Sequence, residues 1–178
     1  MNRSLIADRY AKALFKLATE TQELERIYED VNLLQSYCKE AEGFTELLTS
    51  PVLKPAQKKQ AFHSVLEGKV ANNTLNLVDL LIANNREVLL EDINRRFIWL
   101  YKNEKGIKEV TVFTAVEFDA KQQAILDQFL QDQFKAPIEL TVKVKPELLG
   151  GFILKVDGKM ADASMSSKLK QIKKQLLS

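Results

Sequence analysis

The sequence predicts an α+β fold in which an N-terminal all-α helical bundle of five to six helices is followed by a small α+β domain with a short β-sheet. Apolar residues recur at helical spacing through about residue 105. After Gly106 apolar and polar residues alternate instead, as they do in β-strands. We therefore expect two domains, residues 1–105 and residues 106–178.

The composition is that of an ordinary globular protein. The chain has 178 residues, of which 46% are apolar and 28% charged, enough apolar material to form a core without disulfides. Its net charge of +2, from 26 basic and 24 acidic residues, is too balanced for a protein dedicated to nucleic acid or to an anionic membrane surface. The only cysteine, Cys38, excludes an internal disulfide and favours a reducing compartment.

The first predicted helix has two apolar stripes. One stripe combines large and small residues: Ile6, Tyr10, Ala13, Leu14 and Leu17. The second contains only alanines: Ala7, Ala11 and Ala18. A helix with two apolar stripes can pack on two sides.

Residues that start or stop helices divide the rest of the first domain. We expect further helices over about residues 21–43, 44–49, 55–68, 72–84 and 89–103. Pro55 suits a first helical turn, and Asn72 or Asn73 is the expected N-cap of the following helix. Gly43 and Gly68 are expected C-terminal stops.

The second domain begins with a strand and a helix. Val110 and Val112 alternate with Thr111 and Phe113, which predicts a strand. Asp119, with Gln122 three residues later, is a capping box that opens a helix. The expected apolar face of that helix comprises Ile125, Leu126, Phe129 and Leu130.

Two more strands and a last helix complete this domain. Strict alternation predicts a strand over residues 138–145 with one buried face, and a second over residues 152–156. The dipeptide Asp157-Gly158 is typical of a two-residue hairpin turn. Ser164 is the expected cap of a final helix, one face of which carries Lys168, Lys170, Lys173 and Lys174.

No residue pattern indicates a catalytic, metal or cofactor site. His63, the only histidine, lies in a predicted amphipathic helix without partners for nucleophilic catalysis, and one histidine with one cysteine does not make a zinc site. Gly150-Gly151 lacks the spacing of a phosphate-binding loop and fits a tight bend or bulge. We therefore expect no enzyme activity, no cofactor and no metal, and we interpret the chain as an interaction protein.

One alternative comes from a stretch in which basic and aromatic residues interleave. It comprises Arg95, Arg96, Phe97, Trp99, Tyr101 and Lys102. With the lysine-rich C-terminal segment, it allows the hypothesis of an RNA- or ribosome-associated binding module. An ordinary amphipathic helix with a solvated basic face explains the same residues.

Three segments resemble the delta subunit of F-type ATP synthases, a family that includes the mitochondrial oligomycin-sensitivity-conferring protein. The family's opening is similar to residues 5–15, LIADRYAKALF. Its fifth helix is followed by an Asn-Gly-Arg turn, which resembles Asn84-Asn85-Arg86; Asn tolerates the left-handed conformation that ends a helix. The most specific similarity covers residues 138–155, IELTVKVKPELLGGFILK, followed by Asp157, Asp162 and Ser164.

The resemblance implies a structural role. The family's members tie the catalytic α/β head to the b-subunit peripheral stalk, so that the head does not turn with the rotor. The implied partners are the N-terminal helix of one α subunit, for the first domain, and the C-terminal ends of the b subunits, for the second. One copy per complex, no nucleic acid and no direct membrane insertion are expected, at the cytoplasmic face of a bacterial cell membrane because no leader peptide is apparent.

The resemblance also implies which residues meet the α subunit. In the family, its N-terminal helix binds a groove between the first and fifth helices. The matching positions here are Tyr10 and Ala13 on the first helix and, as the expected wall of the fifth, Leu77, Leu80 and Leu81. Gly150, Gly151, Asp157, Gly158, Asp162 and Ser164 are expected to shape the second domain rather than to touch a ligand. Ala163 stands where the family commonly has glycine.

Overall fold

The computed structural model describes residues 3–156 and 159–169 and divides into two compact units, Met1–Tyr101 and Lys102–Ser178. The first unit is helical and the second contains a four-stranded sheet, which confirms the predicted α+β class.

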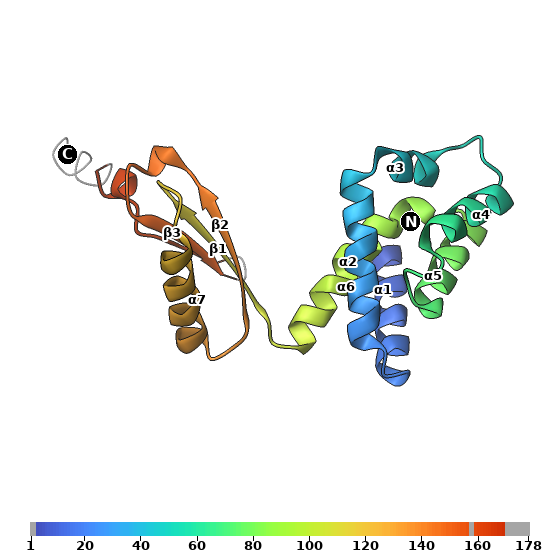
Figure 1. Ribbon diagram of the computed structural model, residues 1–178, viewed down its shortest axis with the longest axis horizontal. Coiled ribbons are helices and arrows are strands. Elements are labelled where there is room, and N and C mark those ends of the chain that lie inside the picture. The colour runs from blue at the N-terminus through green and yellow to red at the C-terminus, as the bar shows by residue number, and fades with distance from the viewer. Residues whose placement is uncertain (1–2, 157–158, 170–178) are drawn as a thin grey trace. The chain divides into compact units, whose positions relative to one another are not determined.

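The helical unit comprises α1 (Arg3–Glu20), α2 (Leu24–Glu40), α3 (Glu42–Thr49), α4 (Pro55–Leu66), α5 (Asn72–Ala83), the 3-10 turn η1 (Glu87–Leu89) and α6 (Leu90–Glu104) (Figure 1). Helix α6 extends past Tyr101, the last residue of this unit. Pro55 occupies the first turn of α4, and Gly68, with a φ of 76°, follows its end, both as predicted. Gly43 does not end the second helix, because the chain leaves the helix at Ala41 in extended geometry and Gly43 lies inside α3.

Helix α1 packs against α2 and α5 (Figure 1). Its buried side chains are Ala7, Ala11, Leu14 and Ala18, which lie on one face. Alanine at three of these four positions lets the neighbouring helices approach closely. The other predicted stripe of this helix is therefore left largely outside the bundle core.

Aromatic pairs tie the long helices together. Phe15 of α1 packs on Phe97 of α6 with 5.8 Å between ring centroids. Tyr28 of α2 stacks on Tyr101 of α6 at 3.7 Å. Such pairs contribute about 0.5–1.5 kcal/mol beyond the area they bury. They hold α6 against α1 and α2.

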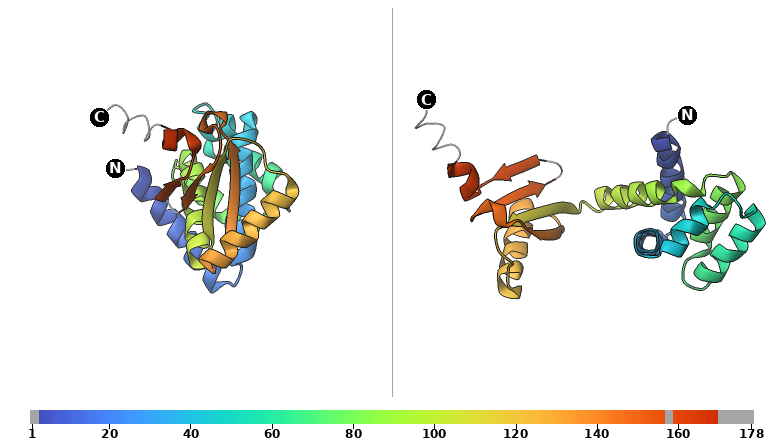
Figure 2. Two further views of the ribbon diagram at one scale, coloured as in Figure 1. Left: turned by 90° about the vertical axis from the view of Figure 1, so that its left-hand side faces the viewer. Right: turned by 90° about the horizontal axis from the view of Figure 1, so that it is seen from above.

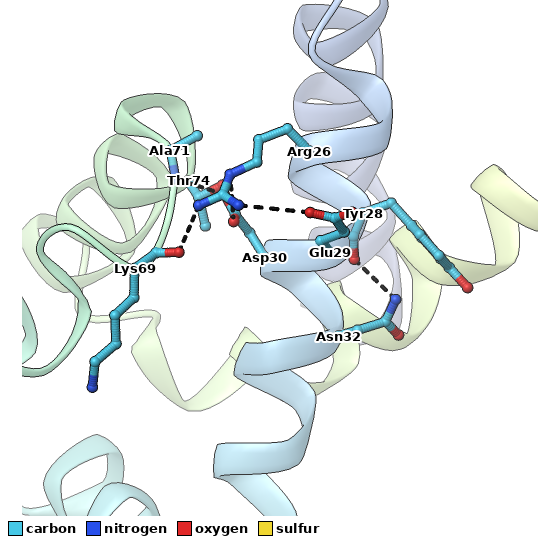
Figure 3. Close-up of polar contacts among 8 residues, drawn as sticks. All are labelled: Arg26, Tyr28, Glu29, Asp30, Asn32, Lys69, Ala71 and Thr74. Carbon is cyan, nitrogen blue, oxygen red and sulfur yellow. Dashed lines mark hydrogen bonds and ion pairs between the residues drawn. The ribbon is translucent and has the colours of Figure 1, made fainter.

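A buried carboxylate holds the start of α5 (Figure 3). Asp30 of α2, 2% exposed, accepts hydrogen bonds from the Ala71 backbone N–H at 2.7 Å and from the Thr74 hydroxyl at 2.8 Å. Arg26 lies 3.4 Å from the same carboxylate and donates to the Lys69 carbonyl oxygen at 2.7 Å. The N-cap residue is Ala71, without a side-chain cap of its own, so the predicted Asn72 or Asn73 cap is wrong. A carboxylate from another helix supplies the negative charge that a helix N-terminus favours.

The second unit is a four-stranded sheet of order β2-β1-β3-β4 with one long helix. Its elements are β1 (Lys108–Thr114), α7 (Ala120–Phe134), β2 (Ile138–Val144), the 3-10 turn η2 (Pro146–Leu148), β3 (Phe152–Val156) and β4 (Lys159–Asp162). Strands β1 and β2 are parallel, which requires the crossover that α7 provides, whereas β3 is antiparallel to both β1 and β4. The Asp119–Gln122 capping box forms as predicted, with the Gln122 N–H donating to the Asp119 carboxylate at 2.7 Å.

One face of the sheet is covered by α7 (Figure 2). Val110, Val112 and Leu130 form the buried core, and Leu126 packs against it. The prediction that Ile125 and Phe129 share this inner face is wrong, since they are 69% and 57% exposed. They are four residues apart and therefore lie together on the outer face of α7.

The Gly150-Gly151 bend leads into β3 and holds the segment after β4. The Met165 N–H donates to the Gly150 carbonyl oxygen at 2.9 Å, and the Ala163 N–H donates to that of Phe152 at 3.0 Å. A Cβ on Gly151, whose φ is 73°, would lie 2.4 Å from the Ala163 carbonyl oxygen. Glycine is therefore required at this close approach.

The segment after β4 starts a short helical stretch at residues 165–169. The Ser164 hydroxyl accepts a hydrogen bond from the Ser167 N–H at 3.3 Å, so Ser164 acts as the predicted cap. Asp162 in turn accepts from the Ser164 N–H at 2.9 Å. Ala163 does not have a positive φ, which explains why it can replace glycine. Asp157, Gly158 and the predicted basic face at Lys170, Lys173 and Lys174 lie outside the described residues.

Asp30→Asn is expected to destabilise the helical unit by roughly 2–4 kcal/mol. The reason is that the neutral amide oxygen of asparagine accepts the two buried hydrogen bonds more weakly than the charged carboxylate does. Urea unfolding followed by the fluorescence of Trp99, the only tryptophan, reports on this unit. The matched control is Glu29→Gln, whose side chain is 70% exposed and should cost less than about 0.5 kcal/mol. Equal stability of the two variants would contradict the role assigned to Asp30.

Gly151→Ala is expected to destabilise the sheet unit by more than about 2 kcal/mol, since it combines a left-handed backbone with a collision against backbone. Gly106→Ala is the control, because Gly106 has a similar φ of 66° but open space around its Cα. Thermal unfolding followed by far-ultraviolet circular dichroism compares the variants. If both lose the same stability, the contact with Ala163 is irrelevant.

Candidate functional site

The residues expected to meet a partner helix divide into exposed and buried ones. Ala13 of α1 is exposed, Tyr10 is half-buried, and Leu80 of α5 is 50% exposed. Leu77 and Leu81 are 8% and 1% exposed, and they pack into the bundle core. In this structure Leu77 and Leu81 offer almost no surface, so among the three leucines only Leu80 is available for contact.

The unburied apolar stripe of α1 forms a continuous strip along that helix. We call it the outer strip; it consists of Ile6, Tyr10, Ala13 and Leu17, spaced by four, three and four residues. Ile6 and Tyr10 are half-buried, Ala13 is exposed and Leu17 is 39% exposed. Helix α1 thus uses one apolar face inside the bundle and presents a second one at the surface.

Arg86 connects the outer strip to the end of α5. Its guanidinium Nη1 donates to the Tyr10 hydroxyl at 3.1 Å and lies near the face of the Tyr10 ring, 5.8 Å from its centroid. The Asn84-Asn85-Arg86 turn is recognisable in the sequence, but this contact of Arg86 is not. The two residues are 76 positions apart, so no local pattern connects them.

The geometry of the turn explains how Arg86 reaches Tyr10. Asn85 adopts the predicted left-handed conformation with a φ of 53°. The Asn85 N–H donates to the Ile82 carbonyl oxygen at 3.1 Å, and the Arg86 N–H to that of Leu81 at 2.8 Å. This is the Schellman arrangement of a helix end. Helix α5 is therefore held at its start by Asp30 and at its end by this turn, and Tyr10 is fixed beside it.

A polar cluster joins α1 to α6. Asp8 pairs with Lys12 at 2.7 Å and with the Arg96 guanidinium at 2.6 Å. The hydrogen bond from Lys12 and the smaller effect of the hydrogen bond from Arg96 lower the pKa of Asp8. Together they outweigh desolvation by burial, which raises it. The carboxylate is therefore charged in any near-neutral buffer.

Most of the interleaved basic and aromatic residues of α6 take part in packing within the helical unit. Phe97 and Tyr101 are buried, and the Arg96 guanidinium covers one face of the Trp99 ring at 4.0 Å from its centroid. One ring with a single uncovered face is not a stacking platform for successive bases. The arrangement is that of an amphipathic helix packed on the bundle.

The residues considered for chemistry have structural partners. His63 Nε2 lies 3.0 Å from an Asp79 carboxylate oxygen, and Lys59 pairs with the same carboxylate at 2.8 Å, which joins α4 to α5. Cys38 is half-buried, and burial, with a smaller effect of Glu91, raises the pKa of its thiol to about 11. A thiol that stays protonated at neutral pH is a poor nucleophile.

Neither a metal site nor a membrane span is present in the described part of the chain. Within residues 3–156 and 159–169, no three of the histidine, cysteine and acidic side chains are grouped so as to hold a metal ion. Over the same ranges, no helix combines the length and the apolar character needed to cross a bilayer.

Comparisons with known proteins agree with one another. The family model described as ATP synthase delta (OSCP) subunit matches residues 6–176. The ATP synthase subunit delta of Lactobacillus gasseri is 34% identical over 179 residues, covering 99% of this chain and 97% of the relative. That of Geobacillus sp. (strain WCH70) is 32% identical over 178 residues, covering 99% of both chains.

The fold is also found in a solved structure. A chain in the cryo-EM structure of the Toxoplasma gondii mitochondrial ATP synthase hexamer superposes with a TM-score of 0.77 and 23% identity, covering 97% of each chain.

These comparisons leave the alternative of an RNA- or ribosome-associated module without support. The family match spans nearly the whole chain, both units included. The chain therefore belongs to the ATP synthase delta (OSCP) subunit family and is a non-catalytic component of the peripheral stalk of an F-type ATP synthase.

Proposed function

We propose that the helical unit binds the N-terminal helix of one α subunit and that the sheet unit binds the C-terminal ends of the b subunits. One copy per complex then joins the catalytic head to the stalk and resists the torque of the rotor. The proposed location is the cytoplasmic face of a bacterial cell membrane, which is supported by the similarity to bacterial delta subunits.

The observation that carries the proposed binding of the α subunit is the outer strip. An amphipathic helix needs an apolar surface about one helix face wide, and Ile6, Tyr10, Ala13 and Leu17 present one beside α5. On α5, Leu80 is the exposed leucine that we propose takes part in this contact, whereas Leu77 and Leu81 lie in the core. The small side chain of Ala13 lets a partner helix approach α1 closely.

The proposed binding of the b subunits is supported by the outer face of α7. Ile125 and Phe129 are apolar and more than half exposed, although the inner face of the same helix already closes the core. An exposed aromatic residue one helical turn from an exposed aliphatic one is a suitable anchor for a helical partner. The two partners thus engage different units of the chain.

Separate attachment sites suit a stator, the part of the complex that does not turn with the rotor. Its contacts must dissociate slowly rather than form quickly. Two moderate contacts within one assembly make dissociation slow. When one contact is released, the other keeps the released surface near its partner at high effective concentration, so the first contact forms again.

Ala13→Asp is expected to weaken binding of the N-terminal helix of the α subunit about tenfold or more, because the partner would bury an unpaired carboxylate. The measurement is calorimetric titration of the full chain with a peptide of about the first 25 residues of the α subunit from the same organism. Ala13 is exposed, so the bundle itself should keep its helicity. The matched control is Ala56→Asp on the exposed start of α4, away from the outer strip. Normal affinity of Ala13→Asp would refute the placement.

Phe129→Asp is expected to weaken binding of a peptide from the C-terminal end of the b subunits about tenfold or more, while leaving the α-peptide titration unchanged. Gln128→Asp, at an exposed neighbouring position, adds the same charge as a control. The reciprocal result holds for Ala13→Asp, which should affect only the α peptide. If either variant changed both titrations, the two contacts would not belong to separate units.

A further inference from the structure

An open groove lies between the first turns of α1 and the helix α6. Its volume is about 780 Å³, and its lining includes Arg3, Leu5 and Asp8 from α1 and Arg95, Arg96 and Trp99 from α6. We call it the α1–α6 groove. It shares no lining residue with the outer strip, with Leu80 or with the outer face of α7.

The carboxylates of the groove are paired with basic side chains. Asp8 lies 2.6 Å from Nε of Arg96 and 2.7 Å from Nζ of Lys12. Asp92, which also lines the groove, pairs with Arg95. The groove thus already seats two carboxylates on its arginines. Planar guanidinium groups match carboxylates in shape as well as in charge.

Basic groups are in excess in this groove. Its lining contains three arginines against two aspartates, a formal charge of +1. Arg3 is exposed and has no acidic partner within residues 3–156 and 159–169. The Arg95 side chain is 66% exposed although it pairs with Asp92. A further carboxylate would therefore meet an unpaired guanidinium at Arg3, whereas a cation would meet only carboxylates that already have basic partners.

Two large apolar side chains are exposed in the same groove. Leu5 is 63% exposed and Trp99 is 50% exposed. The Arg96 guanidinium lies over the Trp99 ring at 4.0 Å from its centroid, so one face of the ring is covered. Tryptophan and arginine are among the residues that most often dominate the binding energy of an interface. A ligand that fits this groove therefore combines a carboxylate with an apolar group.

The exposure of these side chains favours a polypeptide over a small molecule. A small molecule in its site buries roughly 70–90% of its surface. Leu5, Arg95 and Trp99 are each half exposed or more, so the groove does not enclose a small molecule to that extent. We propose that the α1–α6 groove docks an acidic segment of a partner polypeptide, with a carboxylate on Arg3 and an apolar side chain against Leu5 and Trp99. Neighbouring residues of that polypeptide add contact area outside the groove.

Trp99 reports directly on this groove, because it lines the groove and is the only tryptophan of the chain. The probe is a short blocked peptide that contains glutamates and leucines, titrated into the full chain while the fluorescence of Trp99 is recorded. Two counterparts replace its glutamates by glutamine or its leucines by serine. The glutamate–leucine peptide is expected to bind about threefold or more tightly than either counterpart, in the range of one exposed ion pair.

The result that overturns the proposal is equally defined. Either counterpart may bind as tightly as the glutamate–leucine peptide, or the Trp99 fluorescence may not respond; both exclude the proposed recognition. Inorganic phosphate is titrated in parallel at constant ionic strength. Displacement of the peptide by equal concentrations of phosphate would mean that the groove binds anions in general, which also contradicts a polypeptide site.

Two charge reversals on α1 assign the binding to the groove. Arg3→Glu removes the unpaired guanidinium and should weaken binding of the glutamate–leucine peptide about threefold or more. An acidic residue is favourable in a first helical turn, so this variant should fold. The matched control is Arg9→Glu, which changes the net charge equally at an exposed position outside the groove and should alter the affinity less than about twofold. Equal losses in the two variants would show nonspecific attraction and refute the assignment.

This contact is additional to those proposed for the α and b subunits and does not depend on them. The α and b peptides should keep their affinities for a chain saturated with the glutamate–leucine peptide, because the groove shares no residue with the outer strip or with α7. Loss of either subunit peptide would in turn leave the Trp99 response unchanged. Failure of one proposal is therefore distinguishable from failure of the other.

Discussion

The surface of the helical unit depends on a single buried carboxylate. Asp30 fixes the start of α5 to α2, because it accepts from both the Ala71 backbone and the Thr74 side chain. Arg26 closes the same junction by bridging Asp30 and the Lys69 carbonyl oxygen. Once α5 is fixed at this end, the turn at Asn85 brings Arg86 onto Tyr10, and Tyr10 belongs to the outer strip of α1. The surface proposed for the α subunit is thus connected to the core through Tyr10, Arg86 and α5.

Helix α1 shows how one element can contribute to the core and still keep an apolar face at the surface. Its alanine-rich face is buried against neighbouring helices, so the outer strip is not needed to fill the bundle core. Helix α7 repeats the arrangement in the sheet unit, with Leu126 and Leu130 turned inward and Ile125 and Phe129 turned outward. Each unit therefore completes its own core and keeps an apolar face available. This is the arrangement expected of a protein that joins two partners and performs no bond chemistry.

Local sequence patterns predicted most of the elements. Helical spacing identified α1, α2, α4, α5 and α6, and alternation identified β1, β2 and β3, because these periods follow from backbone geometry alone. The Asp119–Gln122 box, the Ser164 cap and the left-handed Asn85 were predictable for the same reason: each acts within a few residues of itself. Gly43 failed as a helix stop, since glycine is permitted, but not required, to end a helix.

Residue patterns were sufficient for the class of the fold, the order of its two parts, the lack of catalytic motifs and, through the Gly150-Gly151 segment, the family resemblance. They were not sufficient to tell which apolar residues remain exposed. Leu77, Leu80 and Leu81 are alike in sequence, yet only Leu80 reaches the surface, because burial depends on where the neighbouring helices pack. The same holds for Asp30 with Ala71, Arg86 with Tyr10 and Lys58 with Glu87, which lie 41, 76 and 29 residues apart. Contacts of this range carry no periodic signal, so folding alone brings them together.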